Sequence, residues 1–404
     1  MTGSTEVHLP DYDGRSIVNL MASLAIGLDA APGRYRAARL LRAEEVAAAR
    51  HVVLIVVDGL GYEFLQTHSA LAPNLMRHLR GALTSVFPST TAAGVGSFMT
   101  GMAPVEHGLT GWHVYLQQLD AIVAVLPGFG RGGPMYYRDS SDVHALLSPR
   151  PFVDRLPVRT RLVSPRPIAN SPFNTALRGT AELSIYDDLR QMFELTLAAV
   201  QGASRSYVYS YWPDLDSTAH RFGMGGDETL ELLVDLDRRF GEFAEVARSK
   251  DALIVLTADH GHINTGAEVT MTMNEHPEIQ RTFSRALSGE PRAAYAAVVP
   301  EARAGFAGRI ARELDAALTV VPSRDAYAEG WFGPGPAHAE LLNRIGDFIL
   351  LPAHNAMVRD WVPGEKPFPL ASAHGGLSSA EMYVPVICTG GDATFVPGDG
   401  ASAR

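Results

Sequence analysis

The 404-residue chain has almost no lysine and a single cysteine. Lys250 and Lys366 are its only lysines, so nearly all of its positive charge is carried by arginine. A formal net charge of −10, with no block of basic residues, excludes a face for binding duplex nucleic acid. Cys388 lies in the apolar run MYVPVICTG, where it can form no internal disulfide and is expected to be a buried structural thiol.

Long apolar runs are missing as well. No segment approaches the length of a transmembrane helix. The apolar run at 17–28 follows an acidic, polar stretch without basic residues, so we expect a packed helix there and not a signal peptide. These features predict a cytoplasmic protein without a membrane partner. At 46% hydrophobic residues, the chain suits one large domain spanning 1–404.

Apolar runs alternate with helical patterns along the chain. Runs at 52–57, 207–212 and 252–257 are apolar enough to be strands buried on both faces of a sheet. Together they predict an α/β fold with a doubly wound, mostly parallel central sheet and helices on both faces. The later runs AAYAAVV, FILLP and YVPVICTG are expected to extend the same sheet.

Residues that typically start or end helices and strands, such as glycine and proline, predict the remaining elements. We expect a helix from Gly59–Gly61 to about Arg80, a strand at 83–87 and a helix at 91–99. The segment 108–183 is rich in Pro, Gly and Arg, and we interpret it as a partly irregular cap inserted near the active site. A second stretch, 264–335, is also expected to carry added elements.

Acids and imidazoles stand where the apolar runs end. Asp58 follows the first run, and Asp259 and His260 follow the third. Such ends meet at one edge of a parallel sheet, and carboxylates with imidazoles are ligands for zinc or a similar divalent ion. The alternative for Asp58 is a purely structural role, as a cap of the helix that follows it. For His262, two residues after His260, a role behind the ligands or a solvated position is favoured over ligation.

Two further features complete the set. Asp216 and His220 in DLDSTAH are four residues apart and share one face of a helical turn, as joint ligands or as a surface pair. His374 in ASAHGG is uninformative by itself. Thr91 in FPSTTAAG stands at a strand-to-helix turn, where helix N–H groups favour an anion, although a simple helix cap is the alternative.

In this order, the motifs VVDGLG, FPSTTAAGVGSFMTG, YWPDLDSTAH, ADHGH and AHGGLSSAEMYVP resemble the nucleotide pyrophosphatase/phosphodiesterase branch of the alkaline phosphatase superfamily, from Val52 to Val386. The resemblance implies an alkaline phosphatase-like fold and two divalent ions, zinc in the first instance or manganese. It implies that one ion is held by Asp58, Asp259, His260 and Thr91, and the other by Asp216, His220 and His374. Thr91 is implied as the nucleophile, through a phospho-threonine intermediate. Tyr211 is similar to a residue that stacks on the leaving group, with a core aromatic as the alternative.

Charge bears on the substrate, which is expected to be a small phosphate ester. Two divalent ions would bring four positive charges, and the three aspartate ligands with a Thr91 alkoxide four negative ones, so a monoanionic diester fits better than a dianionic monoester. Gly94 stands where the family usually has an Asn that binds a phosphoryl oxygen. Donors must then come from the backbone near Thr91 or from the insertion.

Other functions stay open. A phosphomonoesterase or a phosphomutase of the same superfamily is one alternative. A phosphonate hydrolase is another, and it would need Arg131 or Arg138 in place of the lysines that such relatives use. A non-catalytic metal-binding module is the alternative from a different class. The oligomeric state does not follow from the sequence.

Overall fold

Strand β1 (His51–Val57) lies within the central sheet, and each of its residues is buried. The computed structural model describes residues 6–31, 33–314, 317–365 and 369–390, so Lys366 lies outside the described residues. On one side β1 pairs in parallel with β8 (Ser206–Trp212), and on the other with β9 (Ala252–Thr257). Three apolar runs far apart in the sequence therefore end at one edge of the sheet.

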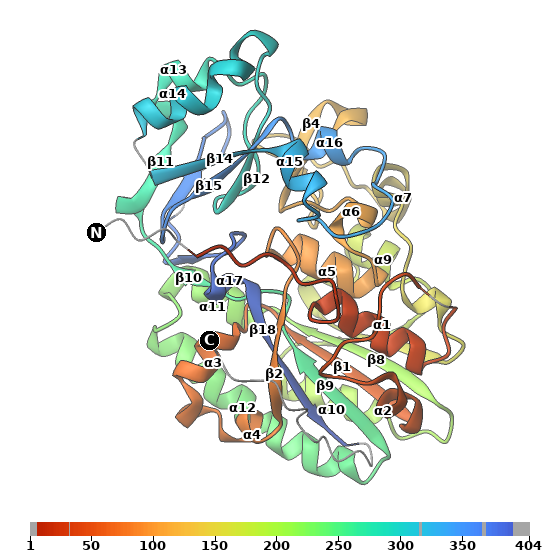
Figure 1. Ribbon diagram of the computed structural model, residues 1–404. Coiled ribbons are helices and arrows are strands. Elements are labelled where there is room, and N and C mark those ends of the chain that lie inside the picture. The colour runs from red at the N-terminus through yellow and green to blue at the C-terminus, as the bar shows by residue number, and fades with distance from the viewer. Residues whose placement is uncertain (1–5, 32, 315–316, 366–368, 391–404) are drawn as a thin grey trace.

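Four more strands complete this seven-stranded sheet, whose order is β2-β18-β9-β1-β8-β6-β7. They are β2 (Leu79–Thr84), β6 (Arg159–Pro165), β7 (Glu182–Tyr186) and β18 (Tyr383–Thr389). Among the described pairings of this sheet, the two that β18 makes, with β2 and with β9, are antiparallel and the others are parallel. The predicted mostly parallel central sheet is confirmed, and helices flank it (Figure 1).

Helices of different lengths pack around the sheet. The longest are α1 (Ile17–Gly27), α5 (Thr91–Thr100), α10 (Leu189–Ala199) and α12 (Asp227–Arg248). The shorter ones are α2 (Ala43–Ala48), α3 (Tyr62–Thr67), α4 (Pro73–Arg77), α6 (Pro104–His107), α7 (Ser140–Leu147), α8 (Arg166–Ala169), α9 (Pro172–Arg178), α11 (Asp214–Phe222), α13 (Pro277–Gln280), α14 (Phe306–Glu313), α15 (Ser323–Ala328), α16 (Leu341–Arg344) and α17 (Ser379–Met382). Helix α1 is largely buried, which confirms a packed helix there.

A second seven-stranded sheet forms the cap, which stands above the central sheet in Figure 1. All its pairings are antiparallel. Its strands, in spatial order, are β14 (Leu318–Pro322), β15 (Phe348–Pro352), β13 (Ala293–Ala296), β12 (Ser288–Glu290), β3 (His113–Leu116), β4 (Ala121–Ala124) and β5 (Phe129–Gly130). Two short ribbons, β10 (Ile263–Asn264) with β17 (Ser372–Ala373) and β11 (Thr270–Thr272) with β16 (Met357–Arg359), complete the strands.

The cap corrects two expectations. The runs AAYAAVV and FILLP do not extend the central sheet, because they form β13 and β15 of the cap. The expected insertion at 108–183 is divided: its first part supplies β3, β4 and β5 to the cap, whereas β6 and β7 join the central sheet. Much of the cap comes instead from the second stretch and the residues after it, which supply β12, β13, β14 and β15. Apolar runs report burial but not the sheet in which a strand pairs.

The expected helix from Gly59 to about Arg80 is wrong. The chain there forms α3 and then α4, which begins at Pro73, and β2 starts at Leu79, earlier than expected. Proline has no N–H to continue a helix but suits the first helical position, so Pro73 starts a new helix. The expected helix at 91–99 is confirmed as α5. Cys388 is buried in β18 as expected. Within the described ranges, no helix combines the length and apolarity needed to cross a bilayer.

Candidate metal centre and active site

The carboxyl ends of β1, β8 and β9 bring the predicted ligands together. One group of potential metal ligands consists of Asp58, Asp259 and His260. The Nε2 atom of His260 lies 3.2 Å from Asp58 Oδ1 and 3.7 Å from Asp259 Oδ2. These three residues come from two strands that are neighbours only in the folded sheet.

Thr91 lies beside this first group. It is the first residue of α5, and its Oγ1 is 3.2 Å from His260 Nε2. Thr90 occupies the N-cap position, so Thr91 stands among the unpaired N–H groups of the first helical turn. A hydroxyl placed there adjoins both a ligand cluster and a binding site for an anion.

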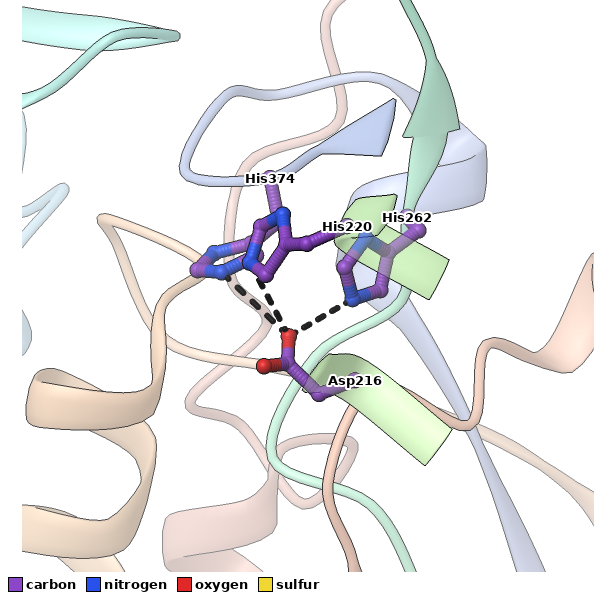
Figure 2. A group of neighbouring side chains, drawn as sticks. All are labelled: Asp216, His220, His262 and His374. Carbon is purple, nitrogen blue, oxygen red and sulfur yellow. Dashed lines mark hydrogen bonds and ion pairs between the residues drawn. The ribbon is translucent and has the colours of Figure 1, made fainter. Parts of the chain in front are cut away.

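The second group surrounds the carboxylate of Asp216 (Figure 2). Three imidazoles point their Nε2 atoms at Asp216 Oδ1: His262 at 2.8 Å, His220 at 3.3 Å and His374 at 3.6 Å. Asp216 and His220 both lie in α11, as their spacing predicted, and His374 follows β17. The rings of His260 and His374 stack with centroids 3.7 Å apart, so the two groups adjoin. Adjoining groups suit a two-ion site.

His262 was not predicted as a member of this cluster. It is buried, which excludes the solvated position. Its Nδ1 lies 3.0 Å from the hydroxyl of Ser372, while its Nε2 reaches Asp216. The sequence held only a weak signal for it, the second histidine of ADHGH.

The imidazoles of the three expected ligands are oriented alike. The Nδ1 atoms of His220, His260 and His374 face the backbone oxygens of Ser372, Gly261 and Ser89, at 2.8, 3.0 and 3.1 Å. An Nδ1–H that donates to a carbonyl leaves Nε2 with a lone pair for a metal. All three rings therefore present Nε2 to the site.

The carboxylates also fit a bound cation. Asp58 Oδ1 and Asp259 Oδ2 are buried and accept no hydrogen bond within the described residues. Burial raises the pKa of both carboxyls well above the usual range, and the neighbouring acids raise it further. Uncompensated buried carboxylates are costly, and a divalent ion would remove that cost. The residues present thus fit the metal ions that the sequence predicts.

Tyr211 lies behind the first group. Its side chain is buried, and its hydroxyl donates a hydrogen bond to Asp58 Oδ2. This contact orients Asp58, because one carboxylate oxygen is held while the other faces His260. Of the two earlier alternatives for Tyr211, the placement favours a core aromatic with a polar contact to the site, and stacking on substrate stays a prediction.

The packing of α5 explains why residue 94 is a glycine. A Cβ atom at this position would lie 2.7 Å from the Cβ of Asp259 and 3.0 Å from its carbonyl oxygen. Helix α5 therefore packs directly on the turn that carries Asp259, and an asparagine at 94 would displace this expected metal ligand. Any side-chain donor to a phosphoryl oxygen must come from another element.

A cavity of about 710 Å³ opens from the candidate ligands into the cap. Thr91, Asp216, His220 and His374 line its floor. Cap residues on its walls include Trp112, His113, Arg131, Glu290, Arg359 and Trp361. The first part of the 108–183 segment thus contributes to the wall of the cavity, and the stretches around β12 and β16 contribute more of its lining.

The two arginines considered as substitutes for lysine are both engaged. Arg131 lines the cavity, but its guanidinium pairs with Asp360 at 2.9 Å and Glu365 at 2.7 Å. Arg138 is largely exposed and pairs with Asp142. Neither presents an uncompensated charge to the candidate ligands.

Comparison with known proteins agrees with this geometry. Residues 52–365 match the family model described as type I phosphodiesterase / nucleotide pyrophosphatase. Ectonucleotide pyrophosphatase/phosphodiesterase family member 3 of Rattus norvegicus is 23% identical over 257 residues. That alignment covers 56% of this chain and 27% of the relative, so the chain spans only about a quarter of that protein's length.

Solved structures share the fold at low identity. Human ectonucleotide pyrophosphatase/phosphodiesterase 5 has a TM-score of 0.61 at 15% identity, covering 84% of this chain and 87% of that one. Its murine counterpart, as an inactive threonine-to-alanine variant in complex with AMP, has a TM-score of 0.59 at 15% identity, covering 84% and 87%. Phosphonoacetate hydrolase from Sinorhizobium meliloti 1021, in complex with phosphonoacetate, has a TM-score of 0.59 at 17% identity, covering 84% and 90%.

Proposed function

Because this chain belongs to the type I phosphodiesterase/nucleotide pyrophosphatase family of metal-dependent hydrolases, we propose that it hydrolyses small phosphoric diesters with Thr91 as the nucleophile. The observation that carries the proposal is the place of the Thr91 hydroxyl. It stands at the N-terminus of α5 and 3.2 Å from His260, at the floor of the cavity.

The residues divide into two ion-binding sets. Asp58, Asp259 and His260, with Thr91, would hold one ion, and Asp216, His220 and His374 the other. Aspartate and histidine suit zinc, and manganese is the alternative. When bound, the ions would act as Lewis acids on the phosphate and lower the pKa of the hydroxyl beside them. The backbone carbonyls of Ser372, Gly261 and Ser89 accept hydrogen bonds from Nδ1 of the three expected histidine ligands. These contacts orient each Nε2 atom toward the place where an ion would bind.

The reaction follows from the position of Thr91. Its Oγ1 gives up its proton to water and attacks phosphorus in line, and the bond from phosphorus to the departing alcohol oxygen breaks. That oxygen takes up a proton from water, and a phospho-threonine that keeps the second ester group forms. The first-turn N–H groups of α5 face the developing negative charge. Water then attacks the same phosphorus, which releases the phosphate monoester and restores the hydroxyl.

The charge of the site supports a diester. The three aspartates and the nucleophile balance two divalent ions, and the guanidinium of Arg131 is already paired with Asp360 and Glu365. A second phosphate charge would therefore find no uncompensated cation at Arg131 or Arg138. The same pairing counts against a phosphonate hydrolase that would use these arginines to bind a substrate carboxylate. The inactive threonine variant of the murine relative is consistent with a threonine nucleophile here.

A matched pair of substrates tests the proposal. The zinc-loaded protein is assayed with methyl p-nitrophenyl phosphate, a diester, and with p-nitrophenyl phosphate, the monoester with the same leaving group. We expect kcat/KM for the diester to be higher by at least about tenfold, roughly 1.4 kcal/mol in transition-state binding. A monoester preference would make the enzyme a phosphatase, and no turnover of either ester with zinc or manganese would overturn the hydrolase assignment.

A further inference from the structure

Glu290 is a buried carboxyl of the cap that reaches the active site from outside the ligand set. It ends β12, is 7% exposed, and lines the same cavity as Thr91 and His374. No motif in the sequence marks it.

The Glu290 side chain is held by one of its two oxygens. Its Oε1 accepts a hydrogen bond from the Thr90 hydroxyl at 2.5 Å and another from the Trp112 N–H at 2.6 Å. Thr90 directly precedes the nucleophile. In the part of the chain that the structure describes, no hydrogen bond reaches Oε2, although the side chain lines the cavity.

A close glycine contact lets Glu290 enter the site. Gly375, which follows His374, has a φ of +116°, and a Cβ on it would lie 2.6 Å from the Cβ of Glu290. Any larger residue at 375 would therefore push the carboxyl out. Glu290 thus passes between the loop of His374 and the turn that carries Thr91.

The chemistry at this place calls for a neutral donor. Gly94 cannot carry the family's asparagine, because a Cβ there would contact Asp259. A carboxylate would repel the anionic phosphoryl group, whereas a neutral carboxyl donates a hydrogen bond through its O–H. Burial raises the pKa of Glu290 to about 7, against the hydrogen bonds from Thr90 and Trp112, which lower it.

We propose that Glu290 is a further catalytic residue, whose Oε2–H donates a hydrogen bond to one non-bridging oxygen of the phosphoryl group, in the role that Gly94 cannot fill. This inference rests on the proposed function, since it requires a phosphate ester at Thr91. It gives the cap a chemical part in the reaction, because Glu290 belongs to the second sheet.

The two enantiomers of O-methyl O-p-nitrophenyl phosphorothioate, which differ in configuration at phosphorus, test the contact. Sulfur replaces one non-bridging oxygen in each, and only one enantiomer keeps oxygen opposite Glu290. We expect the wild type to prefer that enantiomer and Glu290→Ala to reduce the preference by at least about tenfold. For the oxygen diester, the same variant should lower kcat/KM by about a hundredfold, as loss of an oxyanion donor does. A structural role alone would slow both enantiomers equally and leave the ratio of their rates unchanged, which would overturn the proposal.

A second variant decides the question if Glu290→Ala does not fold. In Glu290→Gln the amide oxygen can still accept from Thr90 and Trp112, and the amide N–H₂ can donate to the substrate. We expect it to keep most of the activity and the preference between the two enantiomers, and a fall of more than tenfold in kcat/KM would refute the donor role. Asp120→Asn, at an exposed cap carboxyl outside the cavity, is the matched control. A wild type that turns over no diester would instead refute the proposed function itself.

Discussion

The Nε2 atom of His262 lies 2.8 Å from Oδ1 of Asp216, and its Nδ1 lies 3.0 Å from the hydroxyl of Ser372. The histidine thus spans from an expected metal ligand to the strand that precedes His374. These two contacts fix the Asp216 carboxylate in one orientation and connect it to the strand that leads to His374.

We expect His262→Ala to weaken ion binding by about 10- to 100-fold without unfolding the protein, because a partner that orients a ligand is removed. Zinc affinity, measured by competition with a chelating dye, checks this. His144→Ala, at an exposed histidine of α7, is the control. An unchanged affinity would mean that the Asp216 carboxylate is positioned without His262.

Metal removal is expected to affect both activity and stability. Mass spectrometry of the loaded protein should find about two divalent ions per chain, and His220→Ala should lose one of them. Chelation with EDTA should abolish hydrolysis and lower Tm, because the buried oxygens Asp58 Oδ1 and Asp259 Oδ2 would face each other's charge without a cation. A protein that binds no ion, and whose Tm EDTA leaves unchanged, would remove the basis of the site.

The nucleophile can be separated from its neighbour. Thr91→Ala should lower kcat by at least about 10⁴-fold, since no hydroxyl remains to form the covalent intermediate. Thr91→Ser should retain measurable turnover. Thr90→Ser is the control, because it keeps the hydroxyl that donates to Glu290. Trapping of the methyl phosphoryl group on residue 91 after reaction with methyl p-nitrophenyl phosphate, followed by peptide mass spectrometry, tests the intermediate directly. The same group on residue 90 would show that the nucleophile is misassigned by one residue.

Tyr211 distinguishes two roles for one side chain. Tyr211→Phe keeps the ring but removes the hydrogen bond to Asp58, a contact to a charged group worth about 1.5–3 kcal/mol. We expect kcat/KM to fall roughly 10- to 100-fold, and equally for methyl p-nitrophenyl phosphate and the thymidine p-nitrophenyl diester. If Tyr211 stacks on a nucleobase instead, the Phe variant will behave like the wild type and Tyr211→Leu will lose only the nucleoside substrate.

The central sheet, and the gathering of the expected ligands at its edge, were largely predictable from the sequence. Asp58, Asp259 and His260 each follow a fully apolar run, and the ends of parallel strands converge at one edge. The four-residue spacing of Asp216 and His220 on α11 was equally local. These features were predictable because each depends on the pattern of residues within a single strand or helix.

The cap was not predictable in the same way. An apolar run such as Ala293–Ala296 reports that a strand is buried, but pairing with β12 and β15 depends on residues far away in the chain. The expected continuous helix after Gly61 failed for a local reason, since Pro73 could have been taken as a helix start.

The sequence by itself determined the residue types, their places at strand ends and the turn that carries Thr91, because each depends on a few neighbouring residues. Only the tertiary structure decided which imidazole nitrogen faces the candidate site, that His262 points at Asp216, and that Tyr211 holds Asp58. It also decided that Glu290 meets Thr90, a contact across 200 residues. Contacts of this kind depend on how two sheets close over one cavity, and no local pattern specifies that closure.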